Sequence, residues 1–391
     1  MSEGWNSEDE LIMLDSIDKW VEKEVRPIAR QHDLDDTYPH DLVEQMKEMG
    51  LFGATIAPEY DGLGLSATTY SKIVERITEV WMAPTGIFNS HLMMAAAIQR
   101  FGTDQQKERF LPRMASGELR GGLALTEPNA GTDLQAIRMT AVRDGDDYIL
   151  NGNKTWITNS LHGGGLAILT KTDPDAQPRH KGMTMFAIET KDAEGNPLPG
   201  LTISKMKKAA YRSIDTCELH FENFRVPAAN LIGEQEGRGF HTAVGGLELG
   251  RINIAARGAG LARGATKMAV RYAQERETMG KPICEHQAIQ LKLGEMAAKT
   301  EASTALIAQA ARMYDTGERC DYEAGIAKYF ASEAGLFCST EAMRIFGGYS
   351  LSVEYEIERY YRDAMLMCIG EGTNEMQRII ISKQLVERNK I

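Results

Sequence analysis

The chain has 391 residues, of which 43% are hydrophobic and 25% are charged, the composition of an ordinary globular protein and not of a disordered one. Its 44 basic and 55 acidic residues give a net charge of −11, which argues against nucleic acid as a partner. No apolar run approaches the roughly 20 residues that cross a bilayer, so we expect no membrane span.

The first residues, Met1–Trp5, contain neither a basic region nor an apolar core, so we expect no signal peptide. The five cysteines are widely spaced and form no Cys-x-x-Cys pair. This spacing argues against a disulfide framework or a zinc site, and it predicts that the protein holds no metal. Cysteines used in this way fit a reducing compartment, so we expect a cytoplasmic protein.

Apolar residues recur at helical spacing through the first third of the chain, for example at Leu14, Ile17 and Val21. Similar patterns continue through residues 95–114. We therefore expect an N-terminal helical domain over residues 1–120.

Residues 121–238 have a different character, because short runs of β-forming residues alternate with turn signals. The runs include Tyr148–Leu150 and Leu166–Leu169, and the turns include Asp144–Asp147. Short strands without intervening helices indicate an antiparallel barrel or sandwich rather than a βαβ sheet. We therefore expect a middle β domain over residues 121–238.

Helical periodicity returns in residues 239–391, where four long stretches predict an antiparallel four-helix bundle. The stretches cover residues 240–274, 287–314, 321–346 and 373–388. Gly258, Gly260 and Gly264 lie inside the first stretch, so we interpret them as sites of close helix packing and not as a dinucleotide fingerprint. The expected fold class is an α+β multidomain protein: helical domain, β domain, helical bundle.

Three segments contain residues suited to binding or catalysis. Residues 126–133 form a polar turn that can hold a phosphate or the edge of a heterocycle. Trp156 and Thr158 share a strand face, which suits stacking on a flat cofactor with one hydrogen bond to it. Glu371 lies between two glycines, just before a helix that Thr373 can cap. Taken alone, the three segments are more simply explained as a polar turn, a core tryptophan and an acid before a helix, respectively.

Taken together, these segments and two others occur in an order that resembles the acyl-CoA dehydrogenase family of flavoenzymes. The resemblance covers essentially the whole chain. The matching segments are Leu125–Asp133, Gly152–Asn159, Arg276–Gly280 with Glu285–Gln287, Ile345–Tyr349 with Glu358–Ala364, and Gly370–Glu375.

The resemblance implies that FAD binds between the β domain and the C-terminal bundle, with Thr126 and Thr158 at the polar edge of the flavin and Trp156 against its rings. It also implies that Arg276, Thr278 and other bundle residues reach the FAD of a neighbouring subunit, in a homotetramer built as a dimer of dimers. The cofactor-binding residues implied are Leu125, Thr126, Thr132, Trp156, Ile157, Thr158, Arg276, Thr278, Gln287, Arg344, Gly347, Gly348, Thr373 and Glu375.

By the same resemblance, Glu371 is the catalytic base that removes the α-proton of an acyl-CoA thioester, and its backbone N–H helps to polarise the thioester oxygen. The implied product is the trans-2-enoyl-CoA of fatty acid metabolism, with electrons passed to an electron-transfer flavoprotein. Some members carry the base at the position that matches Gly250, which cannot serve here. The substrate-binding residues implied are Thr132, Glu248, Arg251 and Gly372.

Several residues depart from the family pattern. Arg344 stands where Gln is usual, and it could add a charge-assisted bond to the FAD pyrophosphate. Gly370 stands where several straight-chain enzymes have Tyr, which predicts a roomier pocket for a branched or cyclic acyl group. Residues 82–98 should line the end of the pocket, and they contain no Lys or Arg, only His91. A dicarboxyl substrate such as glutaryl-CoA is therefore not expected.

Two other functions remain open at this point. One is a flavoenzyme of the same fold with different chemistry, either an acyl-CoA oxidase or an enzyme of elimination or desulfination. The other is a non-catalytic acyl-CoA-binding protein.

Overall fold

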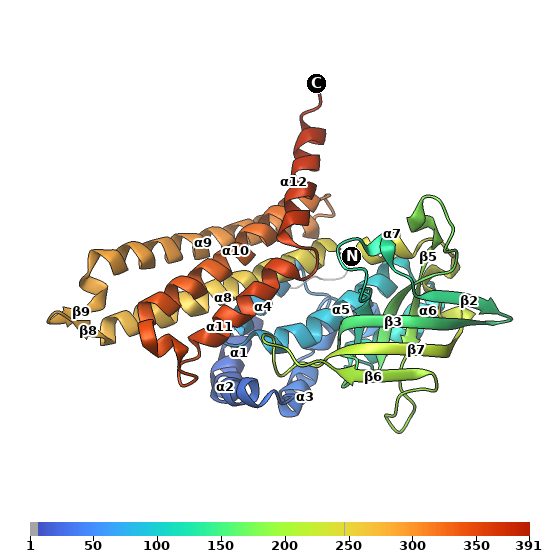
Figure 1. Ribbon diagram of the computed structural model, residues 1–391, viewed down its shortest axis with the longest axis horizontal. Helices are drawn as coiled ribbons and strands as arrows, with labels where there is room; N and C mark the ends of the chain where they lie inside the picture. The colour runs from blue at the N-terminus through green and yellow to red at the C-terminus, as the bar shows by residue number, and fades with distance from the viewer. Residues whose placement is uncertain (1–6, 246) are drawn as a thin grey trace.

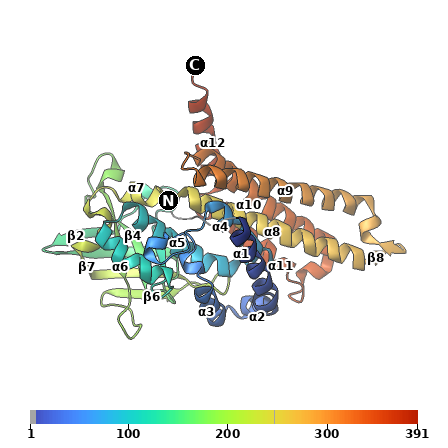
Figure 2. The same cartoon turned by 180° about the vertical axis from the view of Figure 1, so that it is seen from behind.

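A computed structural model describes residues 7–245 and 247–391 of the protein. A curled β-sheet occupies one end of the elongated molecule, long helices extend to the other end, and the N-terminal helices pack between and below them (Figure 1; seen from behind in Figure 2). The predicted fold class, a helical domain, a β domain and a helical bundle in that order, is confirmed.

The N-terminal part is helical, as predicted. Its helices are α1 (Ser7–Trp20), continued through a π-helical turn (Val21–Val25) into α2 (Arg26–Asp35), then α3 (His40–Glu48), α4 (Ala67–Val80), α5 (Met82–Phe101) and α6 (Asp104–Ala115). Local sequence fixes the helix starts: the Ser66 hydroxyl accepts a hydrogen bond from the Thr69 N–H at the start of α4, and Thr103 and Gln106 form a capping box at the start of α6. Helix α5 is buried along most of its length, between α8, the sheet and the other N-terminal helices.

The sheet has seven strands in the order β1-β4-β2-β3-β7-β6, with β5 paired to the other edge of β4. The strands are β1 (Gly121–Ala124), β2 (Thr140–Asp144), β3 (Asp147–Thr158), β4 (Gly165–Lys171), β5 (Met183–Glu189), β6 (Leu201–Lys205) and β7 (Thr216–Pro227). Most pairs are antiparallel, as predicted, but β1 and β2 both pair parallel to β4. This difference arises because β1 and β2 share one edge of β4, at opposite ends of the strand.

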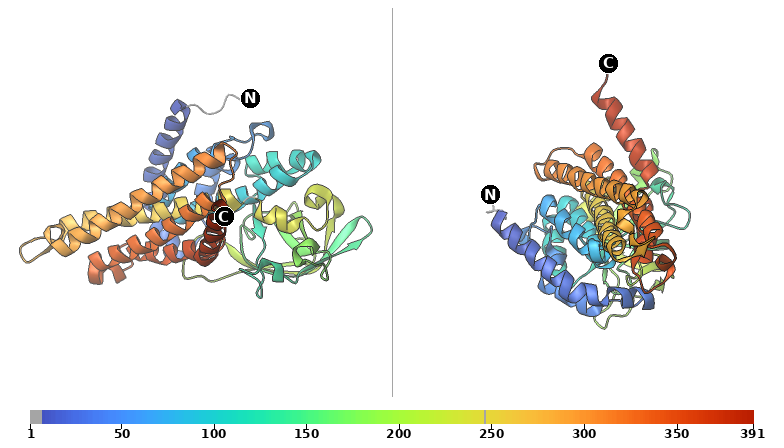
Figure 3. Two further views of the ribbon diagram at one scale, coloured as in Figure 1. Left: turned by 90° about the horizontal axis from the view of Figure 1, so that it is seen from above. Right: turned by 90° about the vertical axis from the view of Figure 1, so that its left-hand side faces the viewer.

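The C-terminal part consists of α7 (Gly239–Val244), α8 (Leu247–Glu275), α9 (Gln287–Asp315), α10 (Asp321–Phe346), α11 (Ile357–Ile369) and α12 (Asn374–Arg388), with the hairpin β8 (Glu277–Thr278) and β9 (Lys281–Pro282). The fourth helix packed along the bundle is α11, which the sequence prediction missed. Helix α12, predicted as that fourth helix, packs on the first half of α10, from Asn374 at Ser332 to Arg388 at Glu323, and projects from the bundle (Figures 1 and 3).

The glycines of α8 serve close helix packing, as predicted. A Cβ built on Gly258 would lie 2.5 Å from the carbonyl oxygen of Ala331 in α10. A Cβ on Gly260 would lie 2.6 Å from the carbonyl oxygen of Glu75 in α4. Helix α8 therefore approaches both neighbours at backbone distance and forms the centre of the bundle.

Within residues 7–245 and 247–391, no helix is long and apolar enough to cross a membrane, and no cluster of His, Cys, Asp or Glu could hold a metal ion. All five cysteines are free thiols.

Candidate active site

Glu371 lies in the short loop that joins α11 to α12, and the backbone of this loop is unusual. Glu371 has φ 52° and Gly372 has φ 89°, so two successive residues adopt the left-handed conformation. Such strain in a residue other than glycine persists only where surrounding contacts enforce it. The predicted cap is present next to it: the Thr373 hydroxyl accepts from the Met376 N–H at the start of α12.

A buried lysine holds this loop in place. The Nζ of Lys328, in α10, donates to the carbonyl oxygen of Gly372 at 2.9 Å and to Oδ1 of Asn374 at 2.8 Å. The lysine side chain is fully buried, and burial lowers its pKa to about 8. Asn374 is held in turn by Ser332, whose hydroxyl donates to the same Oδ1. The loop conformation is therefore set by α10.

The Glu371 carboxyl group is buried, with its two oxygens in different surroundings. Oε1 accepts a hydrogen bond from Nδ2 of Asn89, in α5, at 3.0 Å. Oε2 is buried without a hydrogen-bond partner among the described residues. Burial raises the pKa of Glu371, while Arg257, Asn89 and Lys328 oppose this rise. The result is a carboxylate with one free oxygen and a pKa shifted toward neutrality, as a general base requires.

A chain of hydrogen bonds between α8, α4 and α5 orients Asn89. The Nδ2 of Asn253 donates to the Tyr70 hydroxyl at 2.8 Å, and this hydroxyl donates to Oδ1 of Asn89 at 3.3 Å. Asn89 then donates to Glu371. All three donors thus point toward the carboxylate, and the assignment of the two amide groups is fixed by this direction.

Gly250, the position at which some family members carry their base, faces the same carboxylate. A Cβ built on Gly250 would lie 2.8 Å from Oε2 of Glu371 and 3.0 Å from the thioether of Met93. The two alternative base positions therefore converge on one point of the site, and glycine at 250 leaves room for the carboxylate of Glu371.

The end of strand β3 lies against the same part of α5. Asn159, directly after β3, donates from Nδ2 to the carbonyl oxygens of Ile87 and Gly121. The residue that follows Thr158 is therefore bonded to α5 at Ile87, two residues before Asn89, the partner of Glu371. Trp156 adopts φ 63° at an irregularity in the β3–β7 pairing and exposes 58% of its surface. It is not the core tryptophan of the simpler interpretation.

The polar turn that begins at Thr126 is fastened to β3 by a buried ion pair. The Nζ of Lys154 lies 2.9 Å from Oε1 of Glu127, and both side chains are almost fully buried. The Glu127 carboxylate also accepts the backbone N–H groups of Arg138 and Met139, and the Thr155 N–H donates to the carbonyl oxygen of Thr126. Leu125, Thr126 and Thr158 are half-buried beside this pair, Ile157 is buried, and Thr132 is exposed at the far end of the turn.

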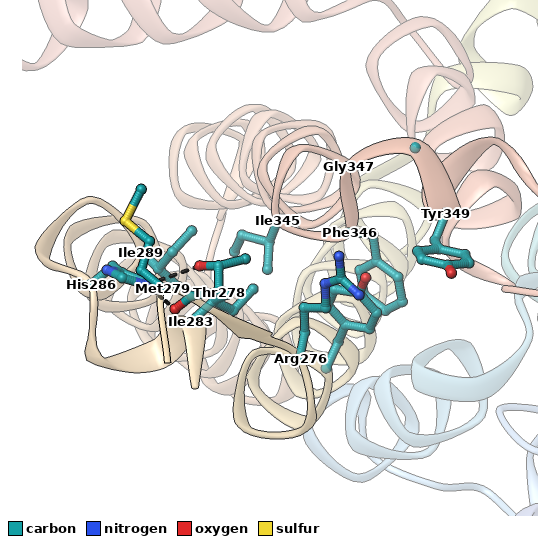
Figure 4. A pocket seen from close by; sticks show the side chains of 12 residues that line it. Arg276, Thr278, Met279, Ile283, His286, Ile289, Ile345, Phe346, Gly347 and Tyr349 are labelled. Atoms are coloured by element: carbon teal, nitrogen blue, oxygen red, sulfur yellow. Dashed lines mark hydrogen bonds between the residues drawn. The ribbon is translucent and has the colours of Figure 1, made fainter. Parts of the chain in front are cut away.

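A second candidate site is an open groove of about 700 Å³ at the far end of the bundle (Figure 4). Tyr272 and Phe346 stack at 4.1 Å between ring centroids along one wall, and Thr278 Oγ1 lies 3.0 Å from Nε2 of His286. A Cβ built on Gly347 or Gly348 meets nothing within 4 Å, so backbone faces open space there. The lining residues are Tyr272, Arg276, Thr278, Met279, Ile283, His286, Ile289, Ile345, Phe346, Gly347, Gly348 and Tyr349.

The structure thus separates the predicted cofactor residues into two groups. One group lies on the polar turn, at the end of β3 and at the start of α12, and the other lies at the groove. Thr373 and Glu375 start α12, beside Ser332, whereas Gly347 ends α10; these points are about 22 Å apart along α10 at 1.5 Å per residue. Gln287 is exposed at the start of α9, next to the groove. Arg344 is not free, because it pairs with Glu341, which also binds Lys292.

Of the predicted substrate residues, Glu248 and Arg251 flank Gly250 on α8 and Gly372 follows Glu371, whereas Thr132 lies away from them on the polar turn. Arg251 is buried and pairs with Asp321 at 3.4 Å between Nη1 and Oδ1. Burial and the charge of Asp321 raise the pKa of Glu248. Gly372 accepts the bond from Lys328 described above.

The sequence interpretation assumed that residues 82–98, including His91, line the end of the pocket. The structure instead turns the His91 ring into the core. Its Nδ1 accepts the Gly121 N–H at 3.1 Å, so its Nε2 donates to the carbonyl oxygen of Phe52 at 3.0 Å. Burial lowers its pKa to about 4, so it stays neutral inside the core. Sequence analysis missed the residues that do surround the carboxylate. The one available signal was polar residues inside otherwise apolar helices; these residues are Tyr70, Asn89, Asn253, Arg257 and Lys328.

Comparison with known proteins agrees with this geometry. Family models for acyl-CoA dehydrogenase match as the N-terminal domain over residues 7–118, the middle domain over 122–224 and the C-terminal domain over 237–386. An acyl-CoA dehydrogenase of Bacillus subtilis (strain 168) is 37% identical over 382 residues, 97% of this chain and 98% of that protein.

Solved structures give the same result. Butyryl-CoA dehydrogenase from Megasphaera elsdenii is 33% identical, with a TM-score of 0.92 over 99% of this chain and 100% of that one. A chain in the structure of the electron transferring flavoprotein of Acidaminococcus fermentans is 36% identical, with a TM-score of 0.92 over 99% and 100% of the two chains. The chain therefore belongs to the acyl-CoA dehydrogenase family.

Proposed function

We propose that this protein converts an acyl-CoA thioester to its trans-2-enoyl-CoA, with Glu371 as the base, and passes the electrons to an electron-transfer flavoprotein. Family membership makes it an oxidoreductase that acts on acyl-CoA and carries FAD. The observation that carries the proposal is the buried Glu371 carboxylate, whose Oε2 has no partner among the described residues and whose pKa is raised by burial.

The residues present fit FAD. Trp156 offers a largely exposed aromatic face beside the Thr158 hydroxyl, which suits a flat ring system with a polar edge. The open backbone at Gly347 and Gly348, close to the Arg276 guanidinium, suits a phosphate-bearing part of a ligand. We infer that Trp156, Thr158 and Thr126 hold the flavin part.

The two groups of cofactor residues are far apart within one chain, which supports sharing of each FAD between two copies. In this arrangement the groove of one copy takes the nucleotide end of the FAD held by its neighbour. We therefore propose the homotetramer, a dimer of dimers, implied by the sequence.

In the proposed reaction, Oε2 of Glu371 accepts the α-proton while Oε1 remains bonded to Asn89. The backbone N–H of Glu371 polarises the thioester oxygen, which makes the α-proton more acidic. When bound, FAD would supply the hydride acceptor for this oxidation, so that the β-hydrogen and two electrons could leave the acyl chain as the α,β double bond forms. We further propose that Glu248, Arg251, Thr132 and Gly372 contact the CoA part of the substrate.

Two alternatives predict different behaviour. An oxidase would consume dioxygen in proportion to substrate, and an enzyme of elimination would not release the enoyl-CoA. The buried base with a free oxygen favours ordinary α-proton removal over an elimination and over a non-catalytic binding protein, whereas an oxidase would use the same base and is separated by its oxygen consumption.

The direct test is an anaerobic titration of the purified yellow protein with acyl-CoA thioesters, followed at roughly 450 nm, where an oxidised flavin absorbs. We expect bleaching with release of the enoyl-CoA, and reoxidation by an electron-transfer flavoprotein faster than by dioxygen. The panel includes butanoyl-, octanoyl-, isobutanoyl- and cyclohexanecarbonyl-CoA, because Gly370 predicts tolerance of bulky acyl groups. A flavin that stays oxidised with every thioester contradicts the proposal.

A further inference from the structure

A buried arginine close to the base has no carboxylate partner. Arg257, in α8, is 2% exposed, and within the described part of the chain no Asp or Glu oxygen lies within ion-pairing distance of it. Its Nη1 donates to the Tyr211 hydroxyl at 3.1 Å and its Nη2 to the carbonyl oxygen of Thr85 at 3.3 Å. Both are neutral acceptors, and the Glu371 carboxylate, which Arg257 stabilises by its charge, lies beyond ion-pairing distance.

Three polar atoms near this arginine are buried and unsatisfied. They are Nε of Arg257, Oδ1 of Asn253 and Oε2 of Glu371. A buried charge without a partner is destabilising. A ligand or an ordered water that completes their interactions is one explanation for such groups.

The residues that carry these atoms lie along one continuous surface of α8 and α5, which we call the wall. Gly250, Asn253 and Arg257 follow one another at i, i+3 and i+7, so they lie on one face of α8. Thr85 and Asn89, one turn apart on α5, bond to groups on or beside this face. Gly250 marks the end at which Glu371 meets the α-carbon, and Arg257 lies about 10 Å further along the helix axis.

Tyr211 closes the far end of this wall. Its hydroxyl occupies the place of a side chain on Gly86: a Cβ built there would lie 1.4 Å from the Tyr211 oxygen. The backbone N–H of Tyr211 donates to Oδ1 of Asp363 at 2.7 Å, which fixes the loop that carries it. An acyl chain that ran from Glu371 along this face of α8 would end near the Arg257 guanidinium and the Tyr211 hydroxyl.

We propose that Arg257 binds a carboxylate on the acyl group, so that the preferred substrate is a CoA monothioester of a short dicarboxylic acid. This inference rests on the proposed function, because it places the α-carbon at Glu371. The acyl carboxylate replaces weak neutral contacts of Arg257 with a charge-assisted pair, to which the Tyr211 hydroxyl can also donate.

This substrate class reverses the expectation drawn from residues 82–98. Those residues contain no cation, and His91 turns away from the pocket. The cation comes instead from α8, a helix far away in sequence, and it reaches α5 at Thr85. Sequence inspection of one segment could not reveal it.

The test compares pairs of thioesters of equal chain length: succinyl- with butanoyl-CoA, glutaryl- with pentanoyl-CoA, and adipoyl- with hexanoyl-CoA. In the wild-type holoenzyme we expect kcat/KM at least tenfold higher for the dicarboxyl member of one pair. Arg257→Met should reduce kcat/KM for that member on the order of 100-fold and reverse the preference. Arg271→Met, an exposed position on the same helix, is the matched control and should keep the preference.

A binding measurement separates this inference from the proposed reaction. Titration calorimetry in the Glu371→Gln background, which holds thioesters without turning them over, should show tighter binding of the dicarboxyl member and loss of that advantage when Arg257→Met is added. Equal affinity for the two members, or tighter binding of the neutral 5-hydroxypentanoyl-CoA than of glutaryl-CoA, overturns the inference even if butanoyl-CoA bleaches the flavin. A dicarboxyl preference in binding without any bleaching supports the inference and contradicts the proposed reaction.

Discussion

The side-chain amide of Asn89 and the carboxylate of Glu371 meet across the junction of α5 with the α11–α12 loop, with Nδ2 donating to Oε1 at 3.0 Å. This bond engages one oxygen of the carboxylate and leaves Oε2 without a partner among the described residues, as the proposed role in α-proton removal requires. It also stabilises the charged form of Glu371 against the effect of burial.

Replacing Asn89 should therefore change the pH dependence of catalysis. Asn89→Leu removes a hydrogen bond that favours the carboxylate, so the pKa of Glu371 rises further. A hydrogen bond to a charged group is worth about 1.5–3 kcal/mol, and 1.36 kcal/mol corresponds to one pKa unit. We expect the acidic limb of the kcat/KM profile to move up by roughly one unit or more. Tyr70→Phe, which only loosens Asn89, should give a smaller shift; an unmoved limb in Asn89→Leu contradicts the assigned role.

We expect Glu371 to lower the free energy of unfolding at pH values at which its carboxyl group is ionised. Its pKa is higher in the folded than in the unfolded state, so between these two values the folded protein binds more protons and stability falls as pH rises. Glu371→Gln removes this loss. The variant should melt at a higher Tm than the wild type, with the difference growing above the ordinary pKa of a carboxyl group and then levelling off. A difference that is constant across pH argues against the raised pKa.

Adding a methyl group opposite the carboxylate should impair catalysis without unfolding the protein. In Gly250→Ala the new Cβ would lie 2.8 Å from Oε2 of Glu371, and the nearby thioether of Met93 can move aside. We expect kcat to fall at least tenfold, or about 1.4 kcal/mol. The control is Gly294→Ala, on α9, where the Cβ meets nothing within 4 Å and activity should not change.

The convergence of positions 250 and 371 can be tested by moving the base. Glu371→Gly should abolish turnover, and adding Gly250→Glu should restore part of it, because both positions face the same point. No recovery in a double variant that folds and retains FAD would contradict the convergence.

The buried ion pair beneath the polar turn should contribute to stability. Lys154→Met leaves the Glu127 carboxylate buried without its cation, which costs about 3–5 kcal/mol. Adding Glu127→Gln should recover part of this loss, because it removes the unpaired charge and its amide oxygen can still accept from one of the two backbone N–H groups of residues 138 and 139. Arg225→Met, which breaks an exposed ion-pair cluster in the same sheet, should cost less than about 1 kcal/mol. Chemical denaturation measures all three; a Lys154→Met variant as stable as the control contradicts this interpretation.

The sequence predicted the order of the domains because helical and β periodicities are local properties. It also predicted the cap at Thr373 and the packing role of the α8 glycines, which depend on neighbouring residues. It assigned α12 to the bundle in place of α11, since amphipathic spacing does not reveal whether a helix runs along a bundle or projects from it. The two parallel pairings of β4 were missed because strand order is not encoded within single strands.

Contacts between residues far apart in the sequence also explain why the residues around Glu371 were not predicted. The bond from Asn89 to Glu371 joins residues 282 positions apart, and that from Arg257 to Thr85 joins residues 172 apart. Family resemblance led to Glu371, but only the folded chain places Asn89, Asn253 and Arg257 beside it. In the sequence, this arrangement is indicated by polar residues within the apolar faces of α5 and α8.

The most direct test of the central claim is single-turnover reduction of the FAD in Glu371→Gln beside the wild type, under anaerobic conditions with a thioester that bleaches the wild-type flavin. The account predicts that the variant retains its FAD and binds the thioester but reduces the flavin at least 10³-fold more slowly, the scale set by loss of a positioned base. Flavin reduction at a near-normal rate in this variant would show that another group removes the α-proton.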